Sequence, residues 1–146
     1  MGRLASLSPD AKEPSRKGQG CVSGITFDAG GLIALDRNDR RVITLLARAG
    51  ELGMHVTVPA TALAQAIRNP SRQVRLARLI RQPNTDLIAL DGPAATAVGL
   101  LLARTATSDI ADAHVVICAE TAGQPVVTSD PNDLRRIAPG LRVIAL

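Results

Sequence analysis

The chain has 146 residues, of which 46% are hydrophobic and 21% charged, and its formal net charge is +4 at pH 7. This length and balance are typical of one globular domain with a core of its own. The longest apolar stretches are far shorter than the roughly 18 residues of a membrane span. The first 23 residues also lack the apolar core of a signal peptide. We therefore expect a cytoplasmic protein with no membrane partner.

The first 23 residues are rich in Ser, Gly, Pro and charge, and we expect them to form a disordered extension to a domain at residues 24–146. That domain carries 13 Arg against 11 Asp and Glu, a net charge of only about +2. Both lysines of the chain, Lys12 and Lys17, lie in the extension. A domain without lysine has no Walker-type, Schiff-base or receiver-domain lysine, which excludes several chemistries of α/β proteins.

In chain order, short β-branched apolar runs alternate with segments whose apolar residues recur at helical spacing. The runs predict strands at residues 25–28, 54–58, 85–90, 125–128 and 141–145. The periodic segments predict a helix that starts near residue 32, followed by helices at 39–49, 60–67, 72–81, 91–104, 109–122 and 130–137. This alternation predicts a three-layer α/β domain, with a mostly parallel five-stranded sheet and helices on both faces.

The predicted helix at residues 72–81 has an apolar and a basic face. We expect Ser71 to cap it and its apolar face to pack inward through Val74, Leu76, Leu79 and Ile80. The other face repeats arginine at every third position, at Arg72, Arg75, Arg78 and Arg81. These arginines either contact RNA phosphates or form a solvated outer face. The chain has no Tyr or Trp and one Phe, so it offers almost no aromatic platform for stacking bases.

Three aspartates are placed to meet at one edge of the predicted sheet. Asp28 and Asp130 each follow a predicted strand, and Asp112 lies in the first turn of the helix that begins near Asp109. Ligands of open parallel sheets bind outside the carboxyl ends of the strands. Converging carboxylates repel one another, so a cation is needed to neutralise them, and oxygen ligands favour Mg²⁺ or Mn²⁺. Such a site suits hydrolysis of phosphodiesters by a metal-activated water.

Several of these aspartates also have a structural interpretation. Asp109, Asp130 and Asp91 are all suited to capping the helices that follow them, whereas Asp28 directly follows a buried strand and has less structural reason to exist. The remaining acidic positions considered are interpreted as solvated surface charges: Asp36, Asp39, Asp86 and Asp133. His114 and Cys118 are four residues apart, but a buried structural role is favoured over a shared zinc ion.

The order of these motifs resembles the PIN domain, and more narrowly the VapC-type ribonuclease toxins of bacterial toxin–antitoxin pairs. The similar segments are the Asp28 strand end with its Ala-Gly-Gly continuation, Asp112-Ala113-His114 on a helix, and Val127-Thr128-Ser129-Asp130-Pro131. The resemblance spans residues 24–146. It implies a Mg²⁺-dependent endoribonuclease with Asp28, Asp112 and Asp130 as catalytic metal ligands. It also implies an RNA substrate, a cognate antitoxin that inserts into the site, and a homodimer.

The family's fourth acidic position departs from the pattern. The resemblance places Gln65 where a glutamate is expected on the helix after the second strand. A glutamine offers an amide oxygen but no negative charge, and Asp109, one helical turn from Asp112, is a possible substitute. Thr128 or Ser129 is expected to orient a water or phosphate oxygen. Two alternatives to the nuclease stay open: a PIN-like domain that acts by RNA or protein binding, and a small-molecule phosphohydrolase.

Overall fold

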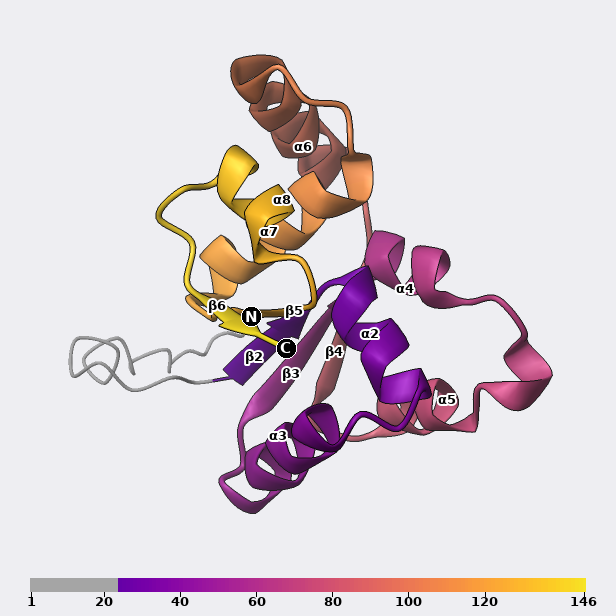
Figure 1. Cartoon of the computed structure of the whole chain (residues 1–146). Helices are drawn as coiled ribbons and strands as arrows, with labels where there is room; N and C mark the ends of the chain where they lie inside the picture. The colour runs from indigo at the N-terminus through magenta and orange to yellow at the C-terminus, as the bar shows by residue number, and fades with distance from the viewer. Residues whose placement is uncertain (1–23) are drawn as a thin grey trace, which may run out of the picture.

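The computed structural model describes residues 24–146, so the extension expected at residues 1–23 lies outside the described residues. Five strands form one sheet, β2 (Gly24–Phe27), β3 (His55–Pro59), β4 (Thr85–Ile88), β5 (Val126–Thr128) and β6 (Val143–Ala145). Their order is β4-β3-β2-β5-β6, and every neighbouring pair is parallel (Figure 1). The five-stranded α/β architecture is confirmed, with a sheet that is parallel throughout.

Helices cover both faces of the sheet (Figure 1). The first layer holds α2 (Ala29–Asp36), α3 (Arg40–Glu51) and α5 (Val74–Arg81), and the second holds α6 (Gly92–Thr105), α7 (Ile110–Ala122) and α8 (Pro131–Ile137). The short α4 (Ala60–Ala66) contacts both α2 and α7, so it bridges the two layers at the carboxyl edge of the sheet. No helix of residues 24–146 is long and apolar enough to cross a membrane.

The core sits where the central strands meet these layers. Phe27, Val58, Val126 and Val127 are fully buried, as expected for strands of a parallel sheet that is covered on both faces. Burying β-branched side chains stabilises such strands, because they have few rotamers to lose and fit the pleated surface. The sheet edge differs: within residues 24–146 no strand lies on the outer side of β4, and three of its four residues are exposed.

The region before α5 differs from its prediction. Residues Pro70–Arg72 form a 3-10 helix, and α5 begins only at Val74 with no side-chain cap, so the capping role of Ser71 is wrong. Gln73 ends the 3-10 turn and is buried, because its amide bonds the backbone of Ala66 and the N–H groups of Arg68 and Asn69. Val74 is 51% exposed and does not pack inward, whereas Leu76 and Leu79 do.

Asp39 also has a structural role that the sequence interpretation missed. Its side chain caps α3 by accepting a hydrogen bond from the Arg41 N–H at 2.8 Å, and its other oxygen pairs with the Arg41 guanidinium at 2.9 Å. The Arg41 guanidinium lowers the pKa of the Asp39 carboxyl below its ordinary value. Asp39 is therefore a helix cap and not simply a solvated charge.

Candidate functional site

Asp28 stands at the carboxyl end of the central strand β2 and at the start of α2. Its side chain is only 6% exposed, and its Oδ1 accepts a hydrogen bond from the Gly31 N–H at 2.7 Å. Asp28 therefore caps α2, and the expectation that it has little structural reason to exist is wrong. Burial raises the pKa of this carboxyl and the charge of Asp130 adds to the rise, while hydrogen bonds from Thr128 and Gly31 oppose it.

Two glycines let α2 start against the end of β5. A Cβ atom on Gly31 would lie 2.6 Å from the carbonyl oxygen of Val127, and one on Gly30 would collide with Ser129 Oγ. The same Cβ on Gly30 would lie 3.4 Å from Asp28 Oδ1. Ser129 Oγ and Asp28 Oδ1 therefore both border the space that a side chain at position 30 would fill.

Asp130 follows β5 and caps α8. Its Oδ1 lies 3.5 Å from the Asp133 N–H, a long capping bond, and its own N–H donates to Thr128 Oγ1 at 2.9 Å. Thr128 is fully buried, whereas Ser129 and Asp130 are exposed. Thr128 thus holds the turn that presents the other two side chains at the edge of the sheet.

The first turn of α7 supplies the remaining carboxylates. Asp109 caps this helix, as predicted, and its Oδ1 accepts a hydrogen bond from the Asp112 N–H at 2.8 Å. The pKa of the Asp112 carboxyl is raised to about 6, first by burial and then by the negative charges of Asp109, Asp28, Asp133 and Asp130. All three predicted ligands thus belong to one electrostatic neighbourhood, which also includes Asp133, a residue expected to be only a solvated surface charge.

Gln65 lies beside the start of α7. A hollow of about 400 Å³ is bounded on one side by Thr61, Ala64 and Gln65 of α4 and on the other by residues 108–111. Gln65 is exposed, and Asp109 is the acidic residue on the opposite wall. The position expected to hold a glutamate therefore faces the carboxylate edge, but it brings an amide there.

The donor set matches a hard divalent cation, because its carboxylate, amide and hydroxyl groups all offer oxygen. Among residues 24–146, however, no three His, Cys, Asp or Glu side chains lie close enough together to hold a metal ion. The capping bonds explain this spacing, since Asp28, Asp109 and Asp130 each direct Oδ1 to a backbone N–H. Each of these bonds uses a single carboxylate oxygen. Asp28 and Asp112 are the two least exposed of these carboxylates.

The arginine stripe does not adjoin these carboxylates. Arg72, Arg75 and Arg78 are exposed on the 3-10 turn and α5, and Arg75 Nη1 reaches the Asp36 carbonyl at 3.5 Å. Asp36 ends α2, whereas Asp28 begins it. Because an eight-residue helix is about 12 Å long, the stripe is one helix length from the carboxylates.

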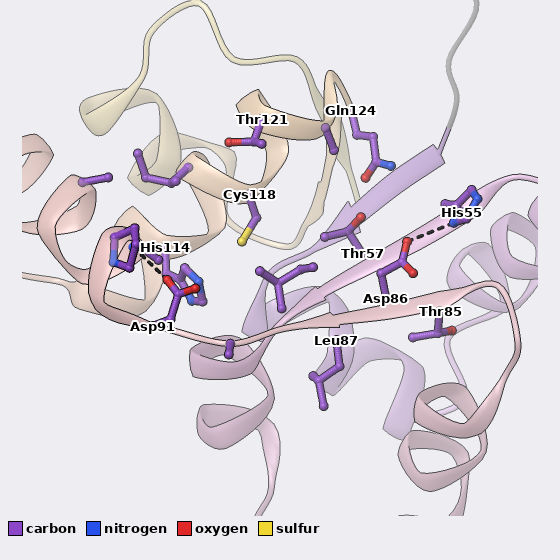
Figure 2. Close-up of a pocket in the computed structure, with 17 residues that line it drawn as sticks. His55, Thr57, Thr85, Asp86, Leu87, Asp91, His114, Cys118, Thr121 and Gln124 are labelled. Carbon is purple, nitrogen blue, oxygen red and sulfur yellow. Dashed lines mark hydrogen bonds and ion pairs between the residues drawn. The ribbon is translucent and has the colours of Figure 1, made fainter. Parts of the chain in front are cut away.

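Sequence reasoning missed a second and larger hollow, between the β4 edge, α6 and α7 (Figure 2). This pocket is lined by His114 and Cys118, the two residues whose spacing had suggested a zinc ion as the less favoured alternative. The His114 Nδ1 is engaged with Thr61 Oγ1 at 2.8 Å, and burial raises the pKa of the Cys118 thiol to about 11. A thiol of that pKa is protonated at neutral pH, which disfavours metal ligation. The structural interpretation of this pair fits these contacts.

Comparisons with known proteins identify a similar fold but no family with a similar sequence. No family model matches the chain, and no curated protein matches its sequence. Among solved structures, a chain of VapBC2 from Rickettsia felis, crystallised with a DNA fragment from their promoter, is similar with a TM-score of 0.59. The alignment covers 84% of this chain and 98% of that one at 13% identity. This likeness agrees with a PIN-like fold.

Proposed function

We propose that the protein is a Mg²⁺-dependent endoribonuclease, the toxin component of a toxin–antitoxin pair. The observation that carries the proposal is the gathering of Asp28, Asp109, Asp112 and Asp130 at the carboxyl edge of the sheet, where burial and the neighbouring negative charges raise the pKa of Asp112. Repulsion between these carboxylates lowers the stability of the fold, and it acts at the edge of the sheet where ligands bind. Groups with perturbed pKa values are concentrated at functional sites. The PIN-like fold shared with VapBC2 supports the same class.

In this proposal each residue has a separate role. Asp28, Asp112 and Asp130 would hold the cation, and Thr128 fixes Asp130 through the bond to its N–H. A bound Mg²⁺ or Mn²⁺ would activate a water and neutralise charge on the scissile phosphate. Ser129 Oγ, beside Asp28, orients a water or a phosphate oxygen. Gln65 donates or accepts a hydrogen bond at this edge without adding to its charge.

The proposed partners are an RNA substrate, a cognate antitoxin and a second copy of this chain. The scarcity of aromatic residues means that RNA recognition rests on polar contacts and shape. Arg72, Arg75 and Arg78 contact phosphates at a distance from the scissile bond, because they lie about one helix length from Asp28.

Cleavage of structured RNA in Mg²⁺ or Mn²⁺ tests the proposal. Asp28→Asn removes the charge but keeps a side chain that caps α2, so the fold is expected to survive and cleavage to fall by at least about a hundredfold. Asp39→Asn is the matched control, because Asp39 caps α3 in the same way outside the carboxylate cluster. Equal rates for the wild type and Asp28→Asn with either metal would refute the nuclease.

A second candidate function is a PIN-like domain that binds RNA or protein without cutting. Two observations favour it, Gln65 in place of a carboxylate and the separation of the aspartates in residues 24–146. RNA binding that persists in Asp28→Asn, with no metal-dependent cleavage by the wild type, would support this candidate instead. Mobility shifts and cleavage assays on the same RNA separate the two.

A further inference from the structure

The large hollow beside β4 has the dimensions of a ligand pocket. It is open to solvent and offers about 900 Å³ between the sheet edge, the first turns of α6 and the second half of α7. Most of its wall is aliphatic, with Ile88, Ala97 and Ile117 among the lining residues. In Figure 2, Thr57 and Asp86 project from β3 and β4 toward the Cys118 side of α7. Pockets of this size and character bind small organic molecules in other proteins.

One polar atom in this wall has no partner. His114 is completely buried, and although its Nδ1 is bonded to Thr61, its Nε2 makes no hydrogen bond. The Ala89 carbonyl is near enough to raise the His114 pKa against the lowering effect of burial, but it does not form a bond of acceptable geometry. Leaving a buried donor or acceptor unpaired is unfavourable, so such groups in native proteins call for an explanation.

The other unpaired buried atom of the described residues is Thr85 Oγ1, and Thr85 also borders the pocket. Thr85 is paired with Val56, one position out of phase with Thr57 and Asp86. Because side chains alternate between the faces of a sheet, Thr85 points away from the face that carries Thr57 and Asp86. On the Thr57 face, His114 Nε2 is the unpaired buried atom of the pocket, which the buried side chains of Thr57 and Gln124 also line.

We propose that this pocket binds a small, uncharged, mainly apolar molecule that makes one hydrogen bond with His114 Nε2. The aliphatic wall selects an apolar body, and the single unpaired ring nitrogen selects one polar group. Anions are disfavoured because the two acidic residues of the lining, Asp86 and Asp91, stand at its rim. This inference does not depend on the ribonuclease proposal, since the pocket lies on a different part of α7.

Occupancy would reach the carboxylates through the helices. His114 shares α7 with Asp112, and its bond to Thr61 ties α7 to α4, the helix that carries Gln65. A ligand that bonds Nε2 fixes the imidazole and with it the Thr61 contact. The pocket is thus placed to adjust the spacing of α4 and α7 from behind the candidate site.

Titration of the protein with p-cresol and with toluene tests the proposal by ¹H–¹⁵N spectroscopy. The two probes have similar shapes, but only p-cresol forms a hydrogen bond. We expect both to shift the amide signals of Ala89, Ala94 and Ile117 saturably at millimolar concentration. The preference for p-cresol over toluene should fall by about three- to tenfold in His114→Leu, the usual worth of one neutral hydrogen bond.

Variants of α6 keep the test decisive if His114→Leu does not fold. Ala97→Phe fills the pocket and should abolish both sets of shifts, whereas Ala95→Phe, on an exposed position of the same helix outside the lining, should preserve them. Absence of saturable shifts in the wild type, or equal shifts in Ala97→Phe, would overturn the proposal. An unchanged probe preference in folded His114→Leu would also overturn it. Conversion of a dimer into a monomer by Ala97→Phe in sedimentation would mean that a second copy covers the pocket, which rejects a small ligand.

Discussion

Asp109 holds the helix on which Asp112 lies and also repels its carboxylate. The Oδ1 of Asp109 accepts a hydrogen bond from the Asp112 N–H at 2.8 Å, while its negative charge raises the pKa of the Asp112 carboxyl. One side chain thus stabilises the helix terminus and makes the residue three positions later harder to ionise. The two effects are separable by substitution.

Asp109→Asn should separate them, because asparagine caps a helix almost as well as aspartate but carries no charge. We expect the Asp112 pKa to fall below about 6, with little change in the free energy of unfolding. Asp109→Ala should lower the pKa likewise but also destabilise the protein by about 1 kcal/mol. Titration of the side-chain carboxyl carbons by NMR, with urea unfolding in parallel, measures both. A pKa that stays near 6 in both variants would show that the Asp109 charge is unimportant.

Stability should fall as pH rises from about 4 to about 6. Asp112 has a folded pKa of about 6 against an ordinary value of 3.8, and that of Asp28 is also raised, so the folded state binds more protons in this window. Asp112→Asn should therefore raise the free energy of unfolding by about 1 kcal/mol at pH 7, a figure reduced for its partial exposure, and by almost nothing at pH 4.

Asp39 should affect the pH dependence of stability in the opposite direction from Asp112. Its folded pKa is lowered by Arg41, so its contribution to stability is present above its ordinary pKa and is lost as the solution becomes more acidic. Unlike Asp112→Asn, the Asp39→Asn variant should not have a higher free energy of unfolding than the wild type at pH 7. Urea unfolding of both variants across this range measures the contrast, and a stability maximum at pH 7 that Asp112→Asn does not raise would contradict the predicted repulsion.

Three glycine-to-alanine substitutions should change the stability of the protein in different directions. Gly31→Ala places a Cβ against the backbone carbonyl of Val127, which cannot move alone, and should cost about 2–3 kcal/mol. Gly30→Ala collides only with Ser129 Oγ, the end of a side chain that can rotate away, so stability should change little. Gly99→Ala, inside α6 with nothing within 4 Å, should stabilise by about 0.5–1 kcal/mol. Thermal unfolding ranks the three, and equal effects for Gly31 and Gly99 would contradict the close approach of α2 to β5.

Gln65→Glu should restore the missing charge. We expect RNA cleavage in saturating Mg²⁺ to rise by about tenfold, equivalent to about 1.4 kcal/mol of transition-state stabilisation. Without metal the same change should lower the melting temperature, because it adds a carboxylate opposite Asp109. Gln82→Glu is the control, since Gln82 is exposed at the end of α5 away from this edge. A rate equal to that of the wild type would mean that Gln65 does not limit turnover.

Much of the fold was predictable because its signals are local. Apolar runs such as Val126–Thr128 and caps such as Asp91 and Asp109 act on their own segments, and the structure places them as expected. The prediction failed before α5, where the buried amide of Gln73 accepts hydrogen bonds from the Arg68 and Asn69 N–H groups and donates one to the Ala66 carbonyl. Helix α5 then begins at Val74 and Ser71 has no capping role. No local pattern signals such a network.

The candidate site was predictable as a set of residues but not as a geometry. The sequence order placed Asp28 and Asp130 after strands, yet whether their oxygens are directed to a cation or to a helix N–H depends on side-chain packing across the sheet. The pocket around His114 was missed for a similar reason. Its walls come from β3, β4, α6 and α7, and only the tertiary arrangement shows that Nε2 is left without a partner.

The strand order has a consequence for the timing of activity during synthesis. Thr26 of the central strand is paired with Val126, near the opposite end of the chain, so β2 lacks one neighbour until β5 has been made. Asp28 is translated well before Asp112 and Asp130. Non-local parallel pairing forms slowly. The carboxylates at the ends of β2 and β5 therefore come together only after β5 has been translated, and a chain truncated before Val126 lacks that arrangement.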